Sequence, residues 1–272
     1  MADATEEPSS KRRATVRSKD ALGGQAKIAV LVPSTNTIVQ PDFDDMRQAL
    51  KLAGVTGVTN HVGRITIPNM DISTDEGFAK LQELIPLEVD AAAERCMSAR
   101  CDHVAMGMSA PTFFGGRAAC VEKRDKLSKM CGGVGISSGS FACEAALKAF
   151  GVQAIAVLSP YAQVGDVEVT RFFTEAGFKV VRFKGLRCPT PIAIAEVTEE
   201  ELRAHMCKLD GPDVEALVQV GTNRSMVALC ARLEVELRKP VLAINAATYW
   251  QAVRSLGIQE KIKGFGRVWE DL

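Results

Sequence analysis

Short runs of β-branched and other apolar residues alternate with longer stretches in which apolar positions recur every three or four residues. The short runs are predicted strands, because a strand that is covered on both faces reads as a nearly continuous apolar segment. The longer stretches are predicted amphipathic helices. The strand candidates are 27–33, 57–67, 101–107, 132–137, 154–160, 178–186, 216–221 and 240–245, and the helix candidates are 75–99, 141–151, 167–177 and 225–239. This alternation predicts an α/β fold with mostly parallel sheets, in which ligands bind in the loops at the carboxyl ends of the strands.

Two short segments of the first half of the chain return in the second half. Residues 28–35 (IAVLVPST) are similar to residues 155–162 (IAVLSPYA), and residues 104–109 (VAMGMS) are similar to residues 218–223 (VQVGTN). The two pairs occur in the same order along the chain. They indicate a duplicated α/β unit, with one ligand site in the cleft between its two copies.

The repeats divide the chain into two predicted lobes of similar build. The first covers residues 26–130 and the second covers residues 131–255, each a mostly parallel sheet flanked by helices. Residues 256–272 are expected to pack back on the first lobe. Residues 1–25 combine clustered charge with small polar residues and have too little apolar surface to fold, so they are predicted to be a disordered leader.

Composition excludes several classes of function. The chain has 33 basic and 33 acidic side chains and a formal net charge of zero, which argues against a nucleic-acid or membrane-surface binder. No apolar run approaches the ~20 residues that span a bilayer. Eight cysteines without a secretory signal fit a reducing compartment, so we expect a cytoplasmic protein whose cysteines are mostly small buried hydrophobes.

Several catalytic motifs can be set aside. The sequence has no complete dinucleotide fingerprint and no GxxxxGK[ST] phosphate loop. Cys96, Cys101 and His103 lack the pairing and the fourth ligand of a zinc site. Residues 135–139 (GISSG) match a nucleophile elbow, but the only later histidine, His205, lies on a charged stretch that is expected to face solvent. We expect no metal and no serine-hydrolase triad.

Polar loops that follow three predicted strands carry more information. Residues 33–37 (PSTNT), 108–109 (MS) and 222–223 (TN) offer hydroxyl, amide and backbone N–H groups where a strand leads into a helix. Such loops bind anions through free N–H groups and the helix dipole. Ser, Thr and Asn also cap helices at these places. If the three loops converge on one cleft, they form a site for a carboxylate or an enolate.

At these loops the sequence resembles the aspartate/glutamate racemase superfamily, in particular its arylmalonate decarboxylase and maleate isomerase branch. The resemblance extends over residues 26–270. The motifs that carry it are VPSTNT (32–37), HVGR (61–64), MGMSAPTFFGG (106–116), SPYAQ around Tyr161, GTN (221–223), NAATYWQAVRSLG (245–257) and GFGR (264–267). The resemblance implies two pseudo-symmetric lobes, a small carboxylic acid as substrate, and no cofactor. In racemases of this superfamily, two cysteines face each other across the cleft.

This sequence departs from the family at both cysteine positions, which are Gly107 and Gly221. Racemisation and thiol-addition isomerisation need a thiolate. Decarboxylation needs chiefly the stabilisation of an enediolate by hydrogen-bond donors, each worth ~3–4 kcal/mol. Cys188 is a candidate for a relocated thiol, because it matches a wall of the family's pocket. Pro191, where maleate isomerases tend to have asparagine, also disfavours isomerisation.

The resemblance assigns roles residue by residue. Oxyanion-stabilising positions are matched by the hydroxyl groups of Ser109 and Tyr161 and by the backbone N–H groups of Thr222 and Asn223. The residues predicted to bind substrate are Pro33, Asn36, Arg64, Gly107, Met108, Pro191, Ile194 and Gly221. Among these, Asn36 is expected to assist with the oxyanion and Arg64 to bind a second carboxylate.

The sequence therefore predicts a cofactor-independent lyase, a decarboxylase of a small malonate-like or dicarboxylic acid. A maleate isomerase or racemase is the alternative enzyme, and a carboxylate-binding pseudoenzyme is the alternative of another class. Tight ligand binding without turnover across a broad substrate screen would favour the pseudoenzyme. The substrate, the stereochemistry and whether the protein is a homo-oligomer stay open at this point.

Overall fold

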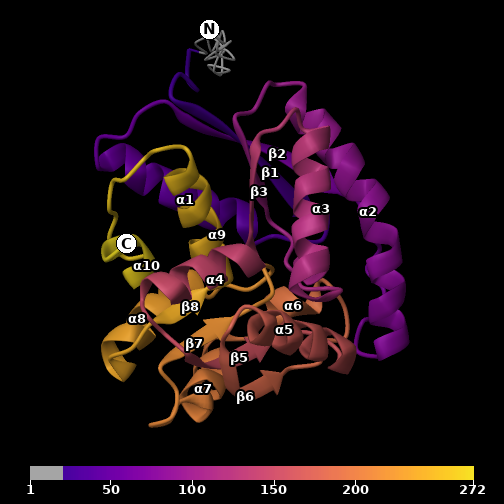
Figure 1. The fold of residues 1–272 in the computed structure, drawn as a ribbon, viewed down its shortest axis with the longest axis vertical. Helices are drawn as coiled ribbons and strands as arrows, with labels where there is room; N and C mark the ends of the chain where they lie inside the picture. Colours follow the sequence, from indigo (N-terminus) through magenta and orange to yellow (C-terminus); the bar gives the residue numbers. More distant parts are fainter. Residues whose placement is uncertain (1–20) are drawn as a thin grey trace, which may run out of the picture.

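The computed structural model describes residues 21–272, and two four-stranded parallel sheets form its centre (Figure 1). The first sheet has the order β2-β1-β3-β4 and the second has the order β6-β5-β7-β8. The first contains β1 (Ala26–Pro33), β2 (Val58–Ile65), β3 (His103–Met106) and β4 (Gly135–Ser138). The second contains β5 (Ala154–Ser159), β6 (Lys179–Gly185), β7 (Ala216–Gln219) and β8 (Val241–Ala243). The predicted α/β fold with two similar parallel sheets is confirmed.

Helices cover both sheets. They are α1 (Val39–Leu52), α2 (Asp75–Met97), the 3₁₀ turn η1 (Ala110–Thr112), α3 (Gly116–Met130), α4 (Gly139–Ala149), α5 (Gln163–Glu175), α6 (Ala193–Glu196), α7 (Glu199–Leu209), α8 (Val227–Leu237), α9 (Ile244–Ser255) and α10 (Arg267–Glu270). Helix α3 was not among the helix candidates because it is rich in charge and buries only Gly116, Cys120 and Leu127. The predicted leader falls mostly on residues 1–20, outside the described part of the chain.

Helix α9 connects the two predicted lobes. It follows the last strand of the second sheet but packs against α1, β3 and β4 of the first. Its Tyr249 hydroxyl donates to Asn60 Oδ1 at 3.0 Å. Helix α10 packs on α9, where Trp269 Nε1 donates to the Ala246 carbonyl at 3.1 Å. The last residues of the chain therefore contact α9, and the division into lobes at residue 255 stays a prediction.

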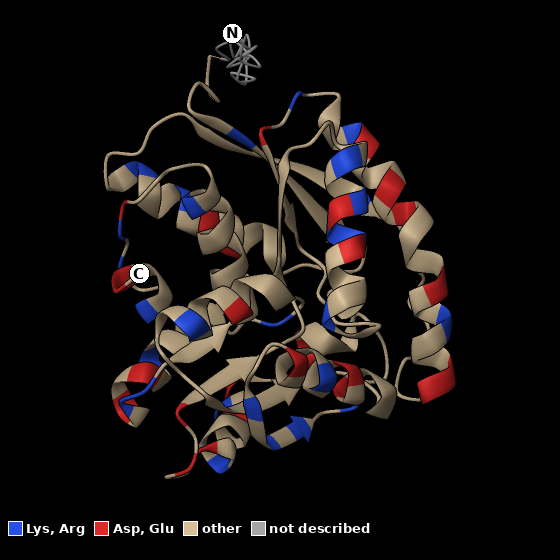
Figure 2. Ribbon diagram, viewed as in Figure 1, with Lys and Arg blue, Asp and Glu red and all other residues tan. Residues whose placement is uncertain are grey.

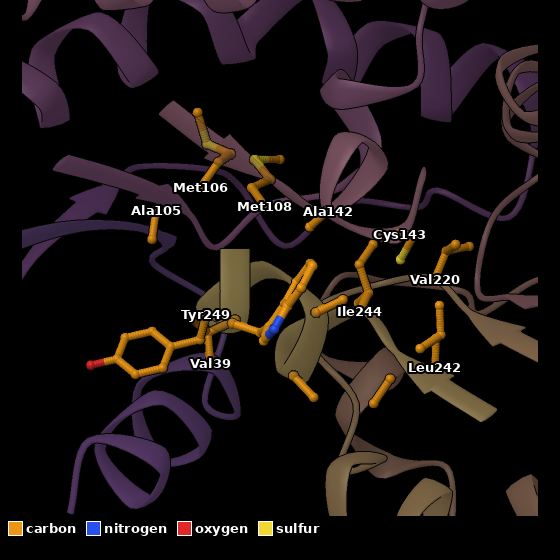
Figure 3. Close-up of a cluster of buried hydrophobic side chains, with 14 of the residues drawn as sticks. Val39, Ala105, Met106, Met108, Ala142, Cys143, Val220, Leu242, Ile244 and Tyr249 are labelled. Atoms are coloured by element: carbon orange, nitrogen blue, oxygen red, sulfur yellow. The ribbon is translucent and has the colours of Figure 1, made fainter. Parts of the chain in front are cut away.

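The core continues from one sheet to the other. All eight residues of β1 are buried, as the nearly continuous apolar run predicts. Figure 3 shows one cluster of buried hydrophobic side chains that includes Val39 and Met106 of the first half and Ile244 and Leu242 of the second. Each fully buried aliphatic side chain of this kind contributes about 1.5–3 kcal/mol. This shared core fixes the position of the loops at the carboxyl ends of the strands.

The motifs that the sequence analysis set aside have structural roles. His103 and Ser137 lie on the neighbouring strands β3 and β4, with His103 Nε2 at 2.9 Å from Ser137 Oγ. Burial lowers the pKa of His103 to about 4, so this imidazole is neutral. Within residues 21–272, no group of three His, Cys, Asp or Glu side chains is arranged to bind a metal ion. In the same part of the chain, no helix is long and apolar enough to cross a membrane.

Candidate active site

The carboxyl-end loops of both sheets meet around a cavity of about 50 Å³. At about 10–15 Å³ for each water, this space holds roughly three to five water molecules. Its lining comes from both halves of the chain and consists of Pro33, Thr35, Asn36, Ile67, Ile72, Phe78, Leu81, Met108, Ser109, Ala110, Tyr161, Pro191, Ile194, Gly221, Thr222 and Asn223. The three polar loops singled out in the sequence therefore do converge on one cavity.

Two predicted substrate-binding residues, Arg64 and Gly107, are not among those that line the cavity. Arg64 is exposed, and its Nη1 donates to the Asn36 carbonyl at 3.0 Å while its Nη2 donates to Gln40 Oε1 at 2.9 Å. This guanidinium group braces the loop after β1 from outside. Arg64 is therefore outside the cavity lining, and its expected contact with a second carboxylate stays a prediction.

A hydrogen bond between the two halves joins the hydroxyl groups of Ser109 and Tyr161. Their oxygens lie 2.6 Å apart, and either group can donate. Because only one hydroxyl hydrogen is used in this bond, the other can be donated to a ligand. Burial raises the pKa of Tyr161 well above its usual value, so the phenol keeps its proton. The Tyr161 ring is fixed against Phe78 at a centroid distance of 5.2 Å.

Asn36 and Thr222 use their side chains to join the halves. Asn36 Oδ1 accepts from the backbone N–H groups of Ile38 and Val39, both at 2.9 Å, and so caps the start of α1. Its Nδ2 donates to Thr222 Oγ1 at 3.3 Å, and that hydroxyl donates to the Gly107 carbonyl at 2.9 Å. These side chains therefore position the cavity wall. The Thr222 hydroxyl has used its hydrogen, whereas the second hydrogen of the Asn36 amide group can still be donated to a ligand.

Asn223 is engaged in the same way. Its Oδ1 accepts from the Thr37 N–H at 3.0 Å, and its Nδ2 donates to the Pro191 carbonyl at 3.0 Å. The loop after β7 is thereby tied to the loop after β1 and to the segment before α6. A side chain with both ends bonded to backbone is a rigid support for the groups beside it.

Backbone N–H groups supply further donors at the cavity. Those of Ser109, Thr222 and Asn223 have no acceptor among residues 21–272. All three residues line the cavity. Unpaired N–H groups at the carboxyl edge of parallel strands are the usual means of stabilising a bound anion.

Neither Gly107 nor Gly221 has space for a side chain. A Cβ at residue 107 would lie 2.8 Å from Val39 Cγ1 and 2.9 Å from the Leu31 carbonyl oxygen. Gly221 has φ +96°, a conformation that favours glycine, and a Cβ there would lie 2.5 Å from Pro160 Cγ. A cysteine at either residue would require its neighbours to move.

Arg224 is a buried cation that the sequence analysis missed. It follows Asn223 directly and is 1% exposed. Its Nη2 lies 3.3 Å from Cys188 Sγ, while its Nε and Nη1 have no hydrogen-bond partner among the described residues. Burial lowers the pKa of Arg224, and its interactions with Cys188 and Tyr161 act in the opposite direction. The only available signal was an arginine next to a polar strand-end motif, which does not reveal burial.

Cys188 is buried beside the site, and it is not a thiolate. Its backbone N–H donates to the Pro160 carbonyl at 2.9 Å, next to Tyr161. Burial raises the pKa of the Cys188 thiol, although the Arg224 guanidinium opposes that rise. Its side chain is not part of the cavity lining. No cysteine of residues 21–272 lines this cavity.

The sequence analysis also missed most of the apolar wall. Ile67 and Ile72 come from the segment between β2 and α2, and Phe78 and Leu81 come from the first turns of α2. These residues have the pattern of ordinary core positions. Only the packing of α2 beside the loop that contains Tyr161 brings them to the cavity.

Comparisons with known proteins show which proteins this chain resembles in sequence and fold. A maleate isomerase of Pseudomonas putida is 24% identical over 251 residues, covering 88% of this chain and 95% of that protein. A solved maleate isomerase of Pseudomonas putida, bound to maleate, matches with a TM-score of 0.81 and 20% identity over 90% of this chain and 97% of that one.

Two further solved structures have the same fold. A maleate cis-trans isomerase of Nocardia farcinica, with a covalently bound succinylcysteine intermediate, has a TM-score of 0.80 and 20% identity over 91% of this chain and 99% of that one. Arylmalonate decarboxylase has a TM-score of 0.71 and 18% identity over 90% of this chain and 100% of that one. The family model for arylmalonate decarboxylase matches residues 69–269. The chain therefore belongs to the arylmalonate decarboxylase family, whose members include decarboxylases and maleate isomerases.

Proposed function

We propose that this protein is a cofactor-independent decarboxylase of a small malonate-like diacid. One observation carries the proposal: hydroxyl and backbone N–H donors from both halves converge on one small cavity that has no thiol in its described lining. Such donors stabilise negative charge on oxygen. Decarboxylation through an enediolate depends chiefly on that stabilisation.

In the proposed reaction, the bond between the central carbon and one carboxylate breaks and CO₂ leaves. The electron pair of that bond passes into the remaining carboxylate, which becomes an enediolate. The free hydroxyl hydrogen of the Ser109–Tyr161 pair donates to it, together with the N–H groups of Thr222 and Asn223. Water or the Tyr161 hydroxyl then gives a proton to the carbon, and the product is a monocarboxylic acid.

The two glycines support a mechanism without thiols. By resemblance, Gly107 and Gly221 are at the positions where relatives have catalytic cysteines. Val39 lies so close to Gly107, and Pro160 so close to Gly221, that a side chain at either glycine would require its neighbours to move. A thiol addition would therefore have no nucleophile at either position.

The cavity favours a small and strongly anionic substrate. Its volume of about 50 Å³ is well below the ~150 Å³ of a cavity that takes up benzene, so it disfavours a substrate with a ring system. The buried charge of Arg224, next in sequence to Asn223, would attract an anion into the cavity through its wall. Arg64 would contribute less, because its charge is exposed and screened by solvent.

A maleate isomerase is the second candidate, because two curated relatives at 24% and 21% identity have that name. In this chain that reaction would require a thiol to reach the cavity, and Cys188 is the nearest candidate by its contacts with Arg224 and the Pro160 loop.

The test is a mass-spectrometric screen of malonate, methylmalonate, phenylmalonate and maleate. We expect CO₂ release from the small malonates and no fumarate from maleate. Conversion of maleate to fumarate without CO₂ release would replace the decarboxylase by the isomerase. Saturable binding of malonates with no product of either kind would support the pseudoenzyme.

A further inference from the structure

A second cavity lies in the first half of the chain, between α2 and α3 and against the first sheet. The two helices run side by side in Figure 1, and the space between them measures about 220 Å³. It is separate from the candidate active site, with which it shares no lining residue. Its lining consists of Gln82, Ile85, Pro86, Val89, Asp90, Met106, Pro111, Thr112, Phe114, Cys120, Lys123, Arg124, Lys126, Leu127, Ile136, Ser138 and Phe141.

The interior of this α2–α3 cavity is apolar. Val89 and Ile85 line it from α2, Leu127 from α3, Ile136 from β4 and Phe141 from α4. An apolar cavity of ~150 Å³ takes up a molecule the size of benzene. The α2–α3 cavity is larger than that, so it has room for a phenyl ring or a short alkyl chain.

The polar groups at this cavity are mostly donors. Lys123, Arg124 and Lys126 contribute three positive charges, against Asp90 in the lining and Asp125, which pairs with Arg124. In Figure 2 the blue ribbon segments of α3 mark its Lys and Arg residues, on the helix that lies next to α2. Gln82 adds a buried Nε2 that has no hydrogen-bond acceptor among the described residues. Such an amide favours a ligand that carries an acceptor.

Part of the basic rim is already engaged. Lys123 Nζ donates to the Phe114 carbonyl at 2.8 Å, and Arg124 Nη2 lies 2.9 Å from Asp125 Oδ1. Arg124 also lies over the Phe141 ring at 4.8 Å. Lys126 is exposed, so it can be substituted without removing a contact that shapes the cavity.

We propose that the α2–α3 cavity binds a small amphipathic monocarboxylate, with its phenyl-sized or short alkyl body among the apolar residues and its carboxylate toward Gln82 and the basic rim. The apolar walls provide affinity for the body. The excess of positive charge selects an acid over a neutral molecule of the same shape.

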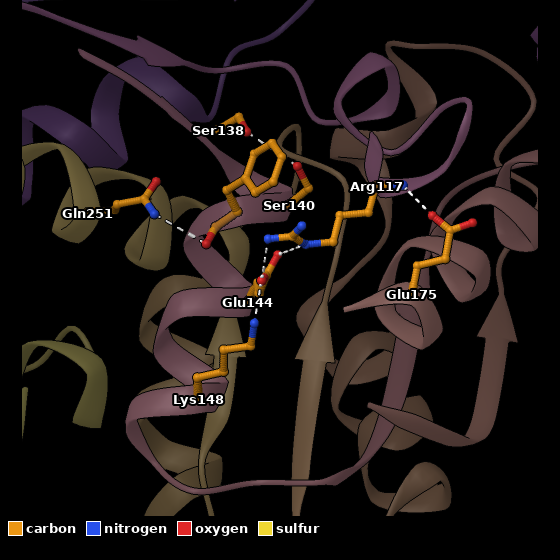
Figure 4. Close-up of polar contacts among 8 residues, drawn as sticks. Arg117, Ser138, Ser140, Glu144, Lys148, Glu175 and Gln251 are labelled. Atoms are coloured by element: carbon orange, nitrogen blue, oxygen red, sulfur yellow. Dashed lines mark hydrogen bonds and ion pairs between the residues drawn. The ribbon is translucent and has the colours of Figure 1, made fainter. Parts of the chain in front are cut away.

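Polar contacts fix α3 to α4 and α5 (Figure 4). Arg117 forms two bonds with Glu144, each at 3.0 Å, and Lys148 approaches the same carboxylate at 2.6 Å. The Arg117 N–H donates to Glu175 at 2.6 Å. Because α3 is fixed to these neighbours, it does not collapse onto α2, and the space exists before a ligand binds.

One segment separates the two cavities. Met106, Pro111 and Thr112 line the α2–α3 cavity, whereas Met108 and Ser109 line the candidate active site. Thr112 Oγ1 donates to the Ser109 carbonyl at 2.7 Å. A ligand against Thr112 would contact a residue that is bonded to Ser109, so we expect occupancy of one cavity to change the affinity of the other.

Calorimetric titration of the full chain with octanoate, 1-octanol and acetate tests the site without requiring turnover. We expect one octanoate for each chain, at least tenfold weaker binding of 1-octanol, and no binding of acetate. Failure of octanoate to bind, or equal affinity for 1-octanol, would overturn the proposal. The outcome is independent of whether the protein decarboxylates any malonate.

Variants locate the bound octanoate. Val89→Phe fills the cavity and is expected to weaken octanoate binding at least tenfold. Val235→Phe makes the same change on the exposed face of α8 and is expected to leave octanoate affinity unchanged. Lys126→Glu is expected to weaken octanoate binding about threefold without affecting the binding of 1-octanol. This variant tests the site if Val89→Phe fails to fold. Unchanged octanoate affinity in both a folded Val89→Phe and Lys126→Glu would contradict the assignment.

Two further measurements exclude other occupants. Saturating octanoate should change the affinity for malonate at least twofold and then reach a plateau, whereas simple competition would place octanoate in the active site and overturn the proposal. Light scattering examines Leu87, which is 78% exposed on α2. If octanoate does not bind and Leu87→Glu converts a dimer into a monomer, this face is an interface between two copies of the chain instead.

Discussion

The two halves of the molecule repeat the same sheet order but differ in the burial of an arginine near the carboxyl ends of their strands. Arg64, at the carboxyl end of β2, is exposed, and its guanidinium group donates to Gln40 and to loop carbonyls. Arg224, after β7, is buried, and two of its three nitrogens have no partner in the described chain. The scaffold is duplicated, but of these two arginines only Arg224, in the second half, is a buried cation with unpaired nitrogens.

The polar side chains of the two halves also divide their work. Asn36 and Asn223 are bonded to backbone groups and fix the loops around the cavity. Tyr161 and Ser109 keep one hydroxyl hydrogen between them for a ligand. The comparison separates residues that build the cavity from residues that can act on what it binds.

The largest effect is expected from Tyr161→Phe. Its hydroxyl would serve charge that develops in the transition state, so kcat should fall about 10²- to 10³-fold with little change in ground-state binding. Tyr249→Phe is the control, because that buried phenol bonds to Asn60 away from the cavity. Steady-state kinetics of both variants checks the prediction, and an unchanged kcat in Tyr161→Phe would remove Tyr161 from the catalytic residues.

The next effect is a difference in KM between substitutions of the two arginines. Arg224→Met removes the buried charge at similar volume and is expected to raise KM for a dianionic substrate about tenfold, equivalent to about 1.4 kcal/mol. Arg64→Met should change KM less than about twofold, because an exposed charge is screened. Equal effects of the two substitutions at low ionic strength would contradict the contrast between the halves.

Gly221→Ala tests whether the loop after β7 excludes a side chain. Overpacking against Pro160 is expected to destabilise the protein by about 1–3 kcal/mol beyond the backbone strain of a positive φ. Gly132→Ala isolates that strain, since Gly132 has φ +75° and no atom within 4 Å of its added Cβ. Urea unfolding of both variants measures the difference, and equal losses would mean that Pro160 yields without cost.

The last prediction concerns the pH dependence of stability. Burial raises the pKa of Asp42 from 3.8 to about 7, and Asn245 links this carboxyl group to the Thr222 carbonyl. Because the folded state binds the proton more tightly, this contribution to stability is complete below about pH 4 and is lost as pH rises toward 7. Asp42→Asn should therefore gain stability relative to wild type between pH 4 and 7, as measured by denaturant unfolding. A difference that does not vary with pH would contradict the raised pKa.

Much of this molecule follows from its sequence, for identifiable reasons. A buried strand such as β1 is unambiguous because all of its residues except Lys27 are apolar, and the polar loops that follow such strands locate the cavity. Helix α3 was missed because few of its residues are apolar. The burial of Arg224 and the outward position of Arg64 depend on contacts between distant segments, which residue type alone does not reveal.

The central claim, decarboxylation without a thiol, is tested most directly by CO₂ release from small malonates before and after treatment with iodoacetamide. The cavity lining contains no cysteine among the described residues, and Cys188 is buried beside it. We predict that the treated protein releases CO₂ at the rate of the untreated protein, and that Cys188→Ser does the same. Loss of CO₂ release on alkylation would contradict the account, whether the label is found on Cys188 or on another cysteine.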